Sequence, residues 1–262
     1  MKFSVVIPYY NHARYLGFLI ESLERQENWI KDIVIVDDGS PDCLDDALNG
    51  IRKRVIDRIR TFRQVNSGTA VALNNGIERA ACEHVAILNS DDAFFEGKLE
   101  RCASILQAEE AALVFGSICF IDDENRVIDG EPDVAWYQRG LNAISRYRNF
   151  ANALIHENVA ATSSNFVFNR GLFDKLGGFR NYRYANDLDF LLRANAIQPV
   201  HFDRHYTHVL YRYHGANTIK EDVDATTREV ERIIKDSVFD SLMESDRVEF
   251  ERACAARGLT FE

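Results

Sequence analysis

Two acidic pairs stand close behind short aliphatic runs, where side chains of this kind can do chemistry. Asp37 and Asp38 directly follow "IVIV", and Asp91 and Asp92 follow "VAIL" after two further polar residues. Adjacent carboxylates repel each other, so two such pairs in one crevice need a cation or hydrogen-bond donors between them. Oxygen ligands without clustered Cys or His favour Mg²⁺ or Mn²⁺ over zinc. The acidic pairs therefore indicate a site for a divalent cation or a polar ligand.

Each acidic pair also has a purely structural interpretation. Asp-Asp-Gly-Ser after a strand forms an ordinary turn, in which Asp37 or Asp38 caps the chain and Gly39 supplies a positive φ. The second pair can instead cap the helix that contains Leu99. Capping becomes a weaker explanation if both pairs end neighbouring strands.

The elements that position these residues follow from the apolar pattern. "FSVVIP", "DIVIVDD" and "HVAILNSDD" are unbroken rather than alternating, which is typical of parallel strands covered on both faces. Between and after them, a helical period of apolar residues predicts helices over 14–26, 70–81 and 98–108. This alternation predicts an α/β sheet with right-handed crossovers. Ligands of such sheets bind at the carboxyl ends of the strands, so Pro8-Tyr9-Tyr10-Asn11 and both acidic pairs are expected at one edge.

The second half of the chain does not continue the regular strand–helix alternation of the first half. The pattern predicts a hairpin from 112–122 and 125–129, strands over 163–170 and 207–214, a helix over 185–196 and a charged helical tail over 221–257. No repeat or Pro/Gly-rich linker separates these parts. We therefore expect one compact unit, with a principal domain over 1–220 and the helical extension 221–262 packed on it.

Composition excludes several classes of function. The chain has 262 residues and a net charge of −10, which argues against a general nucleic-acid binder and suits a protein that binds a cation or a polyol. No apolar run approaches the roughly 18 residues of a membrane span, and the first residues turn polar too soon for a signal peptide. Five scattered cysteines without C-x-x-C pairing are typical of free thiols in a reducing compartment, so we expect a cytoplasmic protein.

Other familiar motifs are absent from the sequence or weak. There is no G-x-G-x-x-G after the first strand, no G-x-x-x-x-G-K-[ST] and no G-x-S-x-G. His201, His205 and His208 have a spacing that only superficially suggests zinc, because the segment is predicted to be a loop leading into a strand. The basic and aromatic stretch 136–160, with Arg139 and its neighbours, suits an anionic acceptor such as a lipid-linked diphosphate or, more simply, a solvated helix face.

Six segments occur in the order and spacing of a known family. Together they resemble the family 2 glycosyltransferases with the GT-A fold, over roughly residues 3–218. The segments are "SVVIPYYNHARYLGFLIESLERQ", "IVIVDDGSPD", "NSGTAVALNNGIERA", "VAILNSDDAFFEGKLE", "GGFRNYRYANDLDFLLRA" and "YRYHGANTIK". The resemblance implies a Rossmann-like, mainly parallel sheet flanked by helices, with a nucleotide-binding half over about 1–125 and an acceptor-binding half over about 126–220.

The resemblance also implies a reaction and its binding residues. The expected activity is transfer of a sugar, with inversion, from a nucleotide-sugar donor that is most often UDP-linked. Asp38 would hydrogen-bond the uracil, with Asp37 beside it. The segments expected to border the nucleotide contain Pro8, Tyr9, Asn11, Asn66 and Gly68. Asp91 and Asp92 match the metal and ribose carboxylates of the D-x-D motif, with Asp92 expected to bind the cation most directly and Asp91 directed to the ribose or the metal.

Asp187 matches the position of the family's catalytic base, and His214 matches a late histidine that approaches the diphosphate or metal. An acceptor hydroxyl is a poor nucleophile, so a carboxylate must remove its proton as it attacks. Asp187 begins a predicted helix, whose dipole favours the ionised form, although N-capping of that helix is the competing interpretation. Asp189 faces elsewhere and can pair with Arg193 four residues on.

Three residues depart from the family's usual pattern. Asn89 replaces the first acid of D-x-D, which leaves fewer carboxylates for the cation. Asn186 replaces the glutamate that commonly precedes the base, and Leu73 stands where an arginine is frequent. Each departure removes a contact of the kind that tunes the donor or metal, and none removes an essential group.

The expected function is thus a metal-dependent inverting glycosyltransferase that uses Mn²⁺ or Mg²⁺ and builds a surface polysaccharide or related glycan. Its partners would be the nucleotide-sugar and a glycan or lipid-linked acceptor, with no nucleic acid, in the cytoplasm or peripherally on the inner face of the membrane. A non-catalytic nucleotide-sugar binder and a sugar nucleotidyltransferase are the alternatives. The tail has heptad-like apolar residues at Val230, Ile233, Ile234 and Val238, which suit either covering the core or forming a homodimer.

Overall fold

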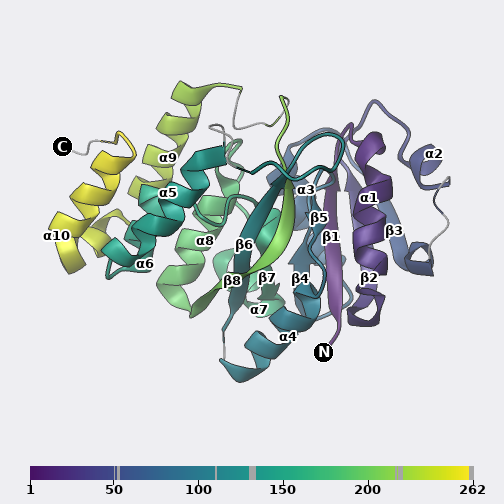
Figure 1. Ribbon diagram of the computed structural model, residues 1–262, viewed down its shortest axis with the longest axis horizontal. Coiled ribbons are helices and arrows are strands. Elements are labelled where there is room, and N and C mark those ends of the chain that lie inside the picture. The colour runs from purple at the N-terminus through teal and green to yellow at the C-terminus, as the bar shows by residue number, and fades with distance from the viewer. Residues whose placement is uncertain are drawn as a thin grey trace.

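The computed structural model describes residues 1–49, 51, 54–109, 111–129, 134–215, 217 and 221–259. One eight-stranded sheet forms its centre, in the order β3-β2-β1-β4-β7-β6-β8-β5 (Figure 1). The strands are β1 (Phe3–Tyr9), β2 (Ile30–Asp37), β3 (Ile59–Arg63), β4 (His84–Ile87), β5 (Ala93–Phe94), β6 (Leu113–Ile121), β7 (Val167–Asn169) and β8 (Val200–Arg212). The helices are α1 (Ala13–Glu24), α2 (Leu44–Asn49), α3 (Thr69–Glu78), α4 (Lys98–Ala108), α5 (Ala135–Ala143), α6 (Phe150–His156), α7 (Arg170–Leu176), α8 (Asn186–Ile197), α9 (Val223–Ser237) and α10 (Phe239–Ala256).

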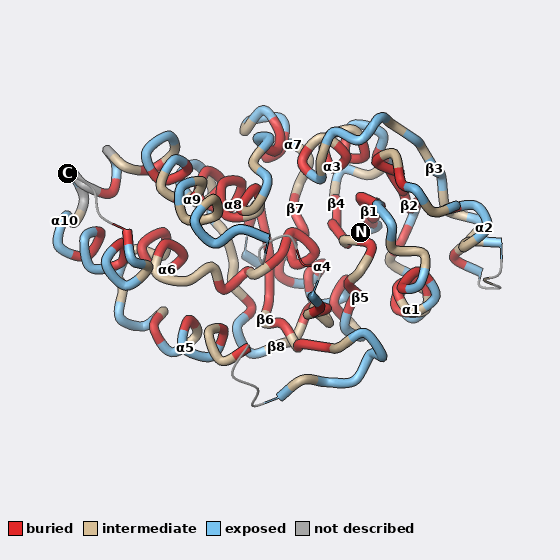
Figure 2. Tube along the Cα trace, turned by 90° about the horizontal axis from the view of Figure 1, so that it is seen from above, coloured by how far each residue is buried: buried red, intermediate tan, exposed pale blue. Residues whose placement is uncertain are grey.

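The first half of the sheet is parallel, as the unbroken aliphatic runs predict. β1 pairs in parallel with β2 and β4, and β2 pairs in parallel with β3. Alternate side chains of β1 enter two different cores: Val5 packs with α1 and α4 residues, whereas Val6 packs with α3 residues. Both faces of β1, β2 and β4 are therefore covered, and Figure 2 shows these strands largely buried, whereas the edge strand β3 is mostly exposed. The predicted α/β class is confirmed.

Gly76 explains how closely α3 approaches the sheet. A Cβ atom at this position would lie 2.4 Å from Val6 Cγ1 and 3.2 Å from Val36 Cγ2. Only a residue without a side chain fits there, because real Cβ contacts are longer. The approach places the N-terminal end of α3 beside the ends of β1 and β2.

The second half of the sheet differs in detail from the expectation. The predicted hairpin reduces to a single bridge between Ile121 and Val127 after β6. β8 starts at Val200, seven residues before the predicted strand, because it pairs in parallel with the whole length of β6. The predicted strand over 163–170 is partly a 3₁₀ turn over Ser163–Asn165, which leaves only three residues for β7. β3 and β5 are additional strands that have no strong apolar pattern of their own.

The C-terminal helices lie at the opposite end of the molecule from α1 and α2 (Figure 1). Val230, Ile233 and Ile234 of α9 are buried in the same apolar cluster as Leu188 and Leu191 of α8. The proposed domain boundary near 220 falls within 218–220, outside the described residues, as does part of the last family-like segment; the division into halves stays a prediction. Within the described ranges, no helix combines the length and the apolar character that crossing a bilayer requires.

Candidate active site

A large cavity opens at the carboxyl ends of β1, β2 and β4. Its volume is about 1490 Å³, which exceeds the roughly 300–1,000 Å³ of a typical small-molecule site and leaves room for two substrates. Of the residues predicted to bind nucleotide or metal or to act as the base, all but Asp37 line it. These are Pro8, Tyr9, Asn11, Asp38, Asn66, Gly68, Asp91, Asp92, Asp187 and His214. The structure thus brings together residues that are spread over more than two hundred positions of the chain.

Asp37 has the turn role that the structural interpretation predicts. Its Oδ1 accepts a hydrogen bond from Ser40 N at 2.7 Å, and Gly39 has a φ of +70°. Its Oδ2 pairs with Arg63 Nη1 at 2.5 Å. The same turn positions Ser40 Oγ, which accepts a hydrogen bond from Asn11 N at 2.6 Å on the rim of the cavity. Asp37 therefore stabilises the ends of β1 and β2 without lining the cavity.

Asp38 organises the segment that carries Asn66 and Gly68. Its Oδ1 accepts hydrogen bonds from Gln64 Nε2 at 2.8 Å and Ser67 N at 2.7 Å, and its Oδ2 accepts one from Gly68 N at 2.9 Å. Gly68 stands at the N-cap of α3 with a φ of +93°, a conformation that glycine adopts without strain. The buried carboxylate thus holds the expected base-binding loop in place.

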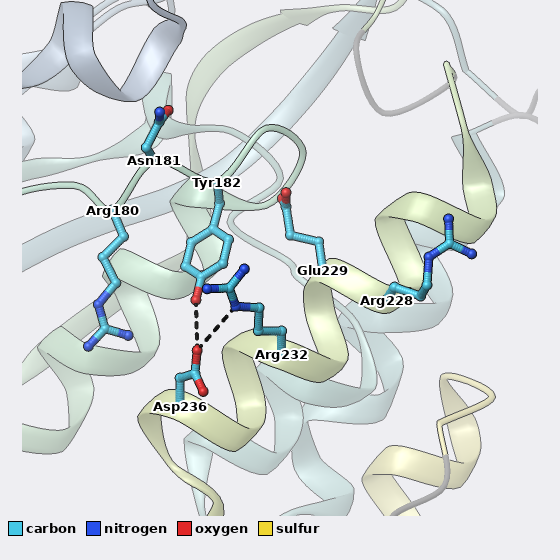
Figure 3. Close-up of a pocket in the computed structure, with 7 residues that line it drawn as sticks. All are labelled: Arg180, Asn181, Tyr182, Arg228, Glu229, Arg232 and Asp236. Atoms are coloured by element: carbon cyan, nitrogen blue, oxygen red, sulfur yellow. Dashed lines mark hydrogen bonds and ion pairs between the residues drawn. The ribbon is translucent and has the colours of Figure 1, made fainter.

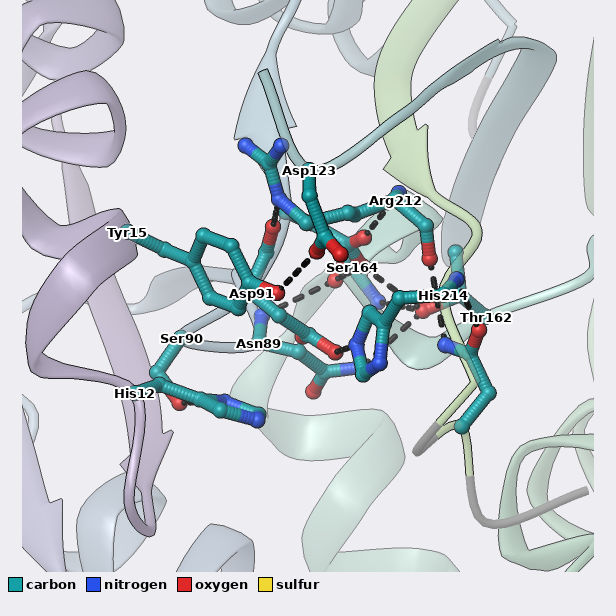
Figure 4. Close-up of polar contacts among 12 residues, drawn as sticks. His12, Tyr15, Asn89, Ser90, Asp91, Asp123, Thr162, Ser164, Arg212 and His214 are labelled. Carbon is teal, nitrogen blue, oxygen red and sulfur yellow. Dashed lines mark hydrogen bonds and ion pairs between the residues drawn. The ribbon is translucent and has the colours of Figure 1, made fainter. Parts of the chain in front are cut away.

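The adjacent acids Asp91 and Asp92 have separate partners; Figure 4 shows Asp91 and its contact with His214. Asp92 is 1% exposed, and its carboxylate accepts hydrogen bonds from Ser164 Oγ (2.5 Å), Thr162 Oγ1 (3.3 Å) and Arg212 N (2.9 Å). Neither acid caps the helix that follows, because Gly97 is the N-cap of α4. Burial and the neighbouring charge of Asp91 raise the pKa of Asp92. The three donors oppose this rise, but burial and the charge of Asp91 outweigh them.

Asp91 instead joins two histidines. Asp91 Oδ2 lies 3.3 Å from His214 Nε2, and the ligand atoms of His12, Asp91 and His214 all lie within 4.8 Å of one another. Burial opposes ionisation of Asp91, but the His214 hydrogen bond and the positive potential of both imidazoles prevail and lower its pKa. Burial lowers the pKa of His12, which favours the neutral, ligand-competent imidazole. Among the described residues this is the group that can hold a metal ion.

Asn89, the departure from the D-x-D pattern, serves the turn behind Asp92. Its Nδ2 donates to Thr162 Oγ1 at 3.0 Å, its Oδ1 accepts from Ser163 Oγ at 3.1 Å, and its N donates to Ser164 Oγ at 2.9 Å. An amide can donate and accept at once, which a carboxylate cannot. Asn89 therefore fastens β4 to the 3₁₀ turn that supplies the donors for Asp92.

Arg212, the last residue of β8, contacts both members of the acidic pair. It is fully buried, donates from Nε to the Asp91 carbonyl at 2.8 Å, and stands 4.3 Å from the centre of the Tyr15 ring. Its other nitrogens reach the Asp122 carbonyl and Asn125 Oδ1. A buried guanidinium with several acceptors both neutralises local negative charge and fixes the loop after β4.

Asp187 lies in the first turn of α8 on the wall of the same cavity. Its carboxylate accepts hydrogen bonds from Leu188 N at 2.7 Å and Asn158 Nδ2 at 3.2 Å. Ala185 is the N-cap of α8, so Asp187 does not have the capping role. Burial raises the pKa of Asp187, and the two donors oppose that rise. The result is a carboxylate whose basicity exceeds that of an exposed aspartate.

The other residues that the sequence singles out lie in ion pairs, in a hydrogen bond or in the core. Asp189 and Arg193 form the expected pair, with 2.6 Å between Oδ2 and Nη2. His201 pairs with Glu109, whereas His208 is buried against Asp203, so these histidines do not share a metal site among the described residues. Of the other two departures, Leu73 is buried in the core, and Asn186 donates to the Tyr182 carbonyl at 3.3 Å.

Several residues of the site carry no signal that identifies them from sequence alone. His12 is a lone histidine before α1, Asn158 is a lone amide, and Arg257 belongs to the tail, yet all three line the cavity. Arg212 had a signal: a single charge within the apolar and aromatic run "THVLYRYH" is unusual in a buried strand and indicates an internal partner.

Comparisons with known proteins agree on one family. The profile described as "Glycosyl transferase family 2" matches residues 4–177. An uncharacterised glycosyltransferase of Nostoc sp. is 37% identical over 129 residues, 49% of this chain and 40% of that protein. An uncharacterised glycosyltransferase of Rickettsia typhi is 28% identical over 82% of this chain and 65% of that protein. These matches span less than two thirds of the relatives' own lengths.

A relative with a more specific name and a solved structure extend the comparison. The putative teichuronic acid biosynthesis glycosyltransferase TuaG of Bacillus subtilis is 32% identical over 48% of this chain and 50% of that protein. The crystal structure of Staphylococcus aureus TarS residues 1–349 in complex with UDP-GlcNAc has a TM-score of 0.64 and 15% identity over 97% of this chain and 80% of that one. The likeness to TarS confirms the GT-A-type fold.

Proposed function

The chain belongs to glycosyl transferase family 2, and from that premise we propose that it transfers a sugar from a nucleotide-sugar donor to an acceptor hydroxyl with inversion. One observation carries this proposal. A half-buried carboxylate with a raised pKa, Asp187, lines the same cavity as Asp91 and His214, which can bind a cation. A base and a diphosphate-binding group in one cavity are what a single displacement at the anomeric carbon requires.

We propose a UDP-linked donor, bound between the ends of β1, β2 and β4. Support comes from the crystal structures of TarS in complex with UDP-GlcNAc and with UDP, and from the loop that Asp38 holds beside Pro8 and Asn66. Asp38 binds the base directly or through the backbone that it orders. The acceptor, a hydroxyl of a glycan or a lipid-linked glycan in surface polysaccharide synthesis, occupies the part of the cavity near Asp187 and Trp136.

The donor set at the acidic edge fits a divalent cation. We propose that Asp91 and His214 hold it, with His12 as a third ligand; the hydrogen bonds of Asp92 favour a supporting role for that residue rather than the direct contact expected from the family pattern. Imidazole nitrogens suit Mn²⁺ better than Mg²⁺, which prefers oxygen. When bound, such an ion would stabilise the charge that develops on the departing diphosphate.

The chain's own residues then supply the remaining steps. Asp187 accepts the proton of the acceptor hydroxyl while that oxygen forms its bond to the anomeric carbon from the face opposite the diphosphate. The carbon–oxygen bond to the diphosphate breaks at the same time, and both of its electrons leave with the nucleoside diphosphate. Asn158 and the Leu188 N–H hold Asp187 in its ionised form before the transfer.

The proposed function is tested by comparing the wild type with Asp187→Asn. We expect hydrolysis or transfer of a UDP-sugar to depend on Mn²⁺ and to fall by at least about 100-fold in the variant, because general base catalysis contributes about 10²–10⁴-fold. UDP with Mn²⁺ should still raise the unfolding temperature of both proteins equally. Equal turnover by the two proteins would refute the base assignment, whereas binding without turnover in the wild type would favour a non-catalytic nucleotide-sugar binder.

A further inference from the structure

The segment that leads into α8 is held by a carboxylate of the C-terminal tail. Glu229, in α9, accepts hydrogen bonds from Arg183 N at 2.9 Å, Tyr184 N at 2.6 Å and Ala185 N at 2.8 Å. Figure 3 shows its side chain directed from α9 toward the loop that follows Tyr182. Three consecutive backbone donors therefore converge on one side chain more than forty residues away in sequence.

This contact orders the chain that enters a helix without a side-chain cap. Ala185 is the N-cap of α8 and has no side chain that could accept a hydrogen bond, and no side chain caps the helix at that position. The chain before a helix can adopt several entry angles. Since Glu229 fixes the three residues before α8, it also fixes where the first turn, and with it Asp187, enters the cavity.

A second glutamate of the tail holds the partner of Asp187 in the same manner. Glu249, in α10, is 5% exposed and accepts hydrogen bonds from Arg148 N (2.6 Å), Asn149 N (3.0 Å) and Asn152 Nδ2 (2.9 Å). These residues begin α6, the short helix that ends two residues before Asn158. Asn158 in turn donates to Asp187.

The tail also reaches the cavity itself. Arg257, directly after α10, lines the cavity and donates from Nη1 to the Ile155 carbonyl of α6 at 3.2 Å. The matched family profile ends at residue 177, so Glu229, Glu249 and Arg257 lie outside it. Apolar packing of α9 and α10 would be enough to cover the core; the converging carboxylates serve a more specific purpose.

We propose that α9 and α10 form a two-point clamp in which Glu229 positions Asp187 and Glu249 positions Asn158. The clamp rests on the proposed function, because it acts through the base that this function requires. Glu229 and Glu249 are positioning residues that do not touch substrate. A displacement of about 1 Å in a reacting group can lower a rate about 100-fold, so loss of one clamp point should be visible in turnover.

The test compares Glu229→Gln with Glu231→Gln, a matched change on the same helix. Glu231 makes no hydrogen bond or ion pair with any residue the structure describes, so its variant should behave as the wild type. In Glu229→Gln the amide nitrogen must face one of the three N–H donors, which breaks the convergence. We expect kcat to fall about 10- to 100-fold, with the KM for the donor and the thermal shift by UDP and Mn²⁺ within about twofold of the wild type.

If kcat of Glu229→Gln equals that of the wild type, the clamp proposal is refuted. This result would leave the proposed function intact as long as Asp187→Asn is inactive. Equal turnover of Asp187→Asn and the wild type would instead remove the proposed function itself. If Glu229→Gln does not fold, amide hydrogen exchange on the wild-type protein decides. The amides of Arg183, Tyr184 and Ala185 should be protected despite lying outside a helix, and rapid exchange at all three would refute the clamp.

Discussion

Replacing Asn158 by leucine should make the enzyme more sensitive to acid. Asn158 Nδ2 donates to Asp187 Oδ2 at 3.2 Å, and this bond favours the ionised carboxylate against the effect of burial. The other polar atom of the side chain, Oδ1, is buried and has no hydrogen-bond partner within the described structure. Leucine therefore removes one donor and one unsatisfied acceptor at similar volume, and the fold should tolerate it.

The size of the effect follows from the bond. A hydrogen bond to a charged group contributes about 1.5–3 kcal/mol, and a length at the long end of the normal range argues for the lower figure. About 1.4 kcal/mol corresponds to a tenfold change in the proton affinity of the carboxylate. Because the rate on the acid side is proportional to the ionised fraction of Asp187, kcat/KM there should fall about tenfold in Asn158→Leu. At high pH, where Asp187 is ionised in both proteins, the pH-dependent part of the difference should disappear, and only the loss due to the missing positioning contact should remain.

The assay is a profile of kcat/KM against pH with a saturating metal concentration. Asn142→Leu is a suitable control, because Asn142 is exposed on α5 and bonds only to Gln138 within the described residues. Asn158→Asp should move the acid limb in the same direction as Asn158→Leu and further, since it exchanges the donor for a like charge. An acid limb that is identical in all variants would show that the titrating group is not Asp187 or that Asn158 does not stabilise its charge.

Five further substitutions test other parts of the structure. Asp91→Asn and His214→Ala should each reduce the Mn²⁺-dependent part of UDP binding, measured by calorimetry with and without EDTA, because each removes a proposed ligand. Arg212→Met should lower the free energy of unfolding in urea by about 3 kcal/mol, since it removes the three hydrogen bonds that the buried guanidinium donates to Asp91, Asp122 and Asn125. Asp38→Asn should weaken UDP binding and cost about 1–3 kcal/mol of stability, because an amide cannot accept all three hydrogen bonds of the loop. Gly76→Ala should cost about 1–3 kcal/mol in the same urea assay, since its Cβ would meet Val6 at 2.4 Å.

The sequence predicts the half of the fold in which neighbours in sequence are neighbours in space. β1, β2 and β4 each carry an unbroken aliphatic run, so their parallel pairing and the common edge of their ends follow from periodicity. The start of β8 could not be found in this way, because residues 200–206 are only partly buried and their strand character comes from pairing with β6. β5 has two residues and exists only through its pairing with β8.

The same division applies to the site. Asp38, Asp91 and Asp187 follow or begin regular elements, so their positions could be inferred from local pattern and family resemblance. The partners that determine what each carboxylate does come from distant segments: Thr162 and Ser164 reach Asp92 from a 3₁₀ turn about seventy residues later in the chain. Such contacts between distant segments cannot be predicted from the local sequence, because they form only in the packed fold.

Those distant partners account for the difference between two chemically identical neighbours. Asp91 and Asp92 follow the same strand. The Asp92 carboxylate accepts hydrogen bonds from two hydroxyls and one backbone N–H of the protein, whereas Asp91 lies beside His12 and His214. A motif of adjacent acids thus specifies the place of a site, and the surrounding donors specify which acid remains available to a ligand. The same reasoning applies to Asp187 and Asp189 on α8. Arg193 and Arg180 pair with the second acid, while the first has two neutral donors among the described residues and faces the cavity. In both pairs, the acid that we propose to act on a ligand or substrate is the one with fewer strong partners in the described part of the chain.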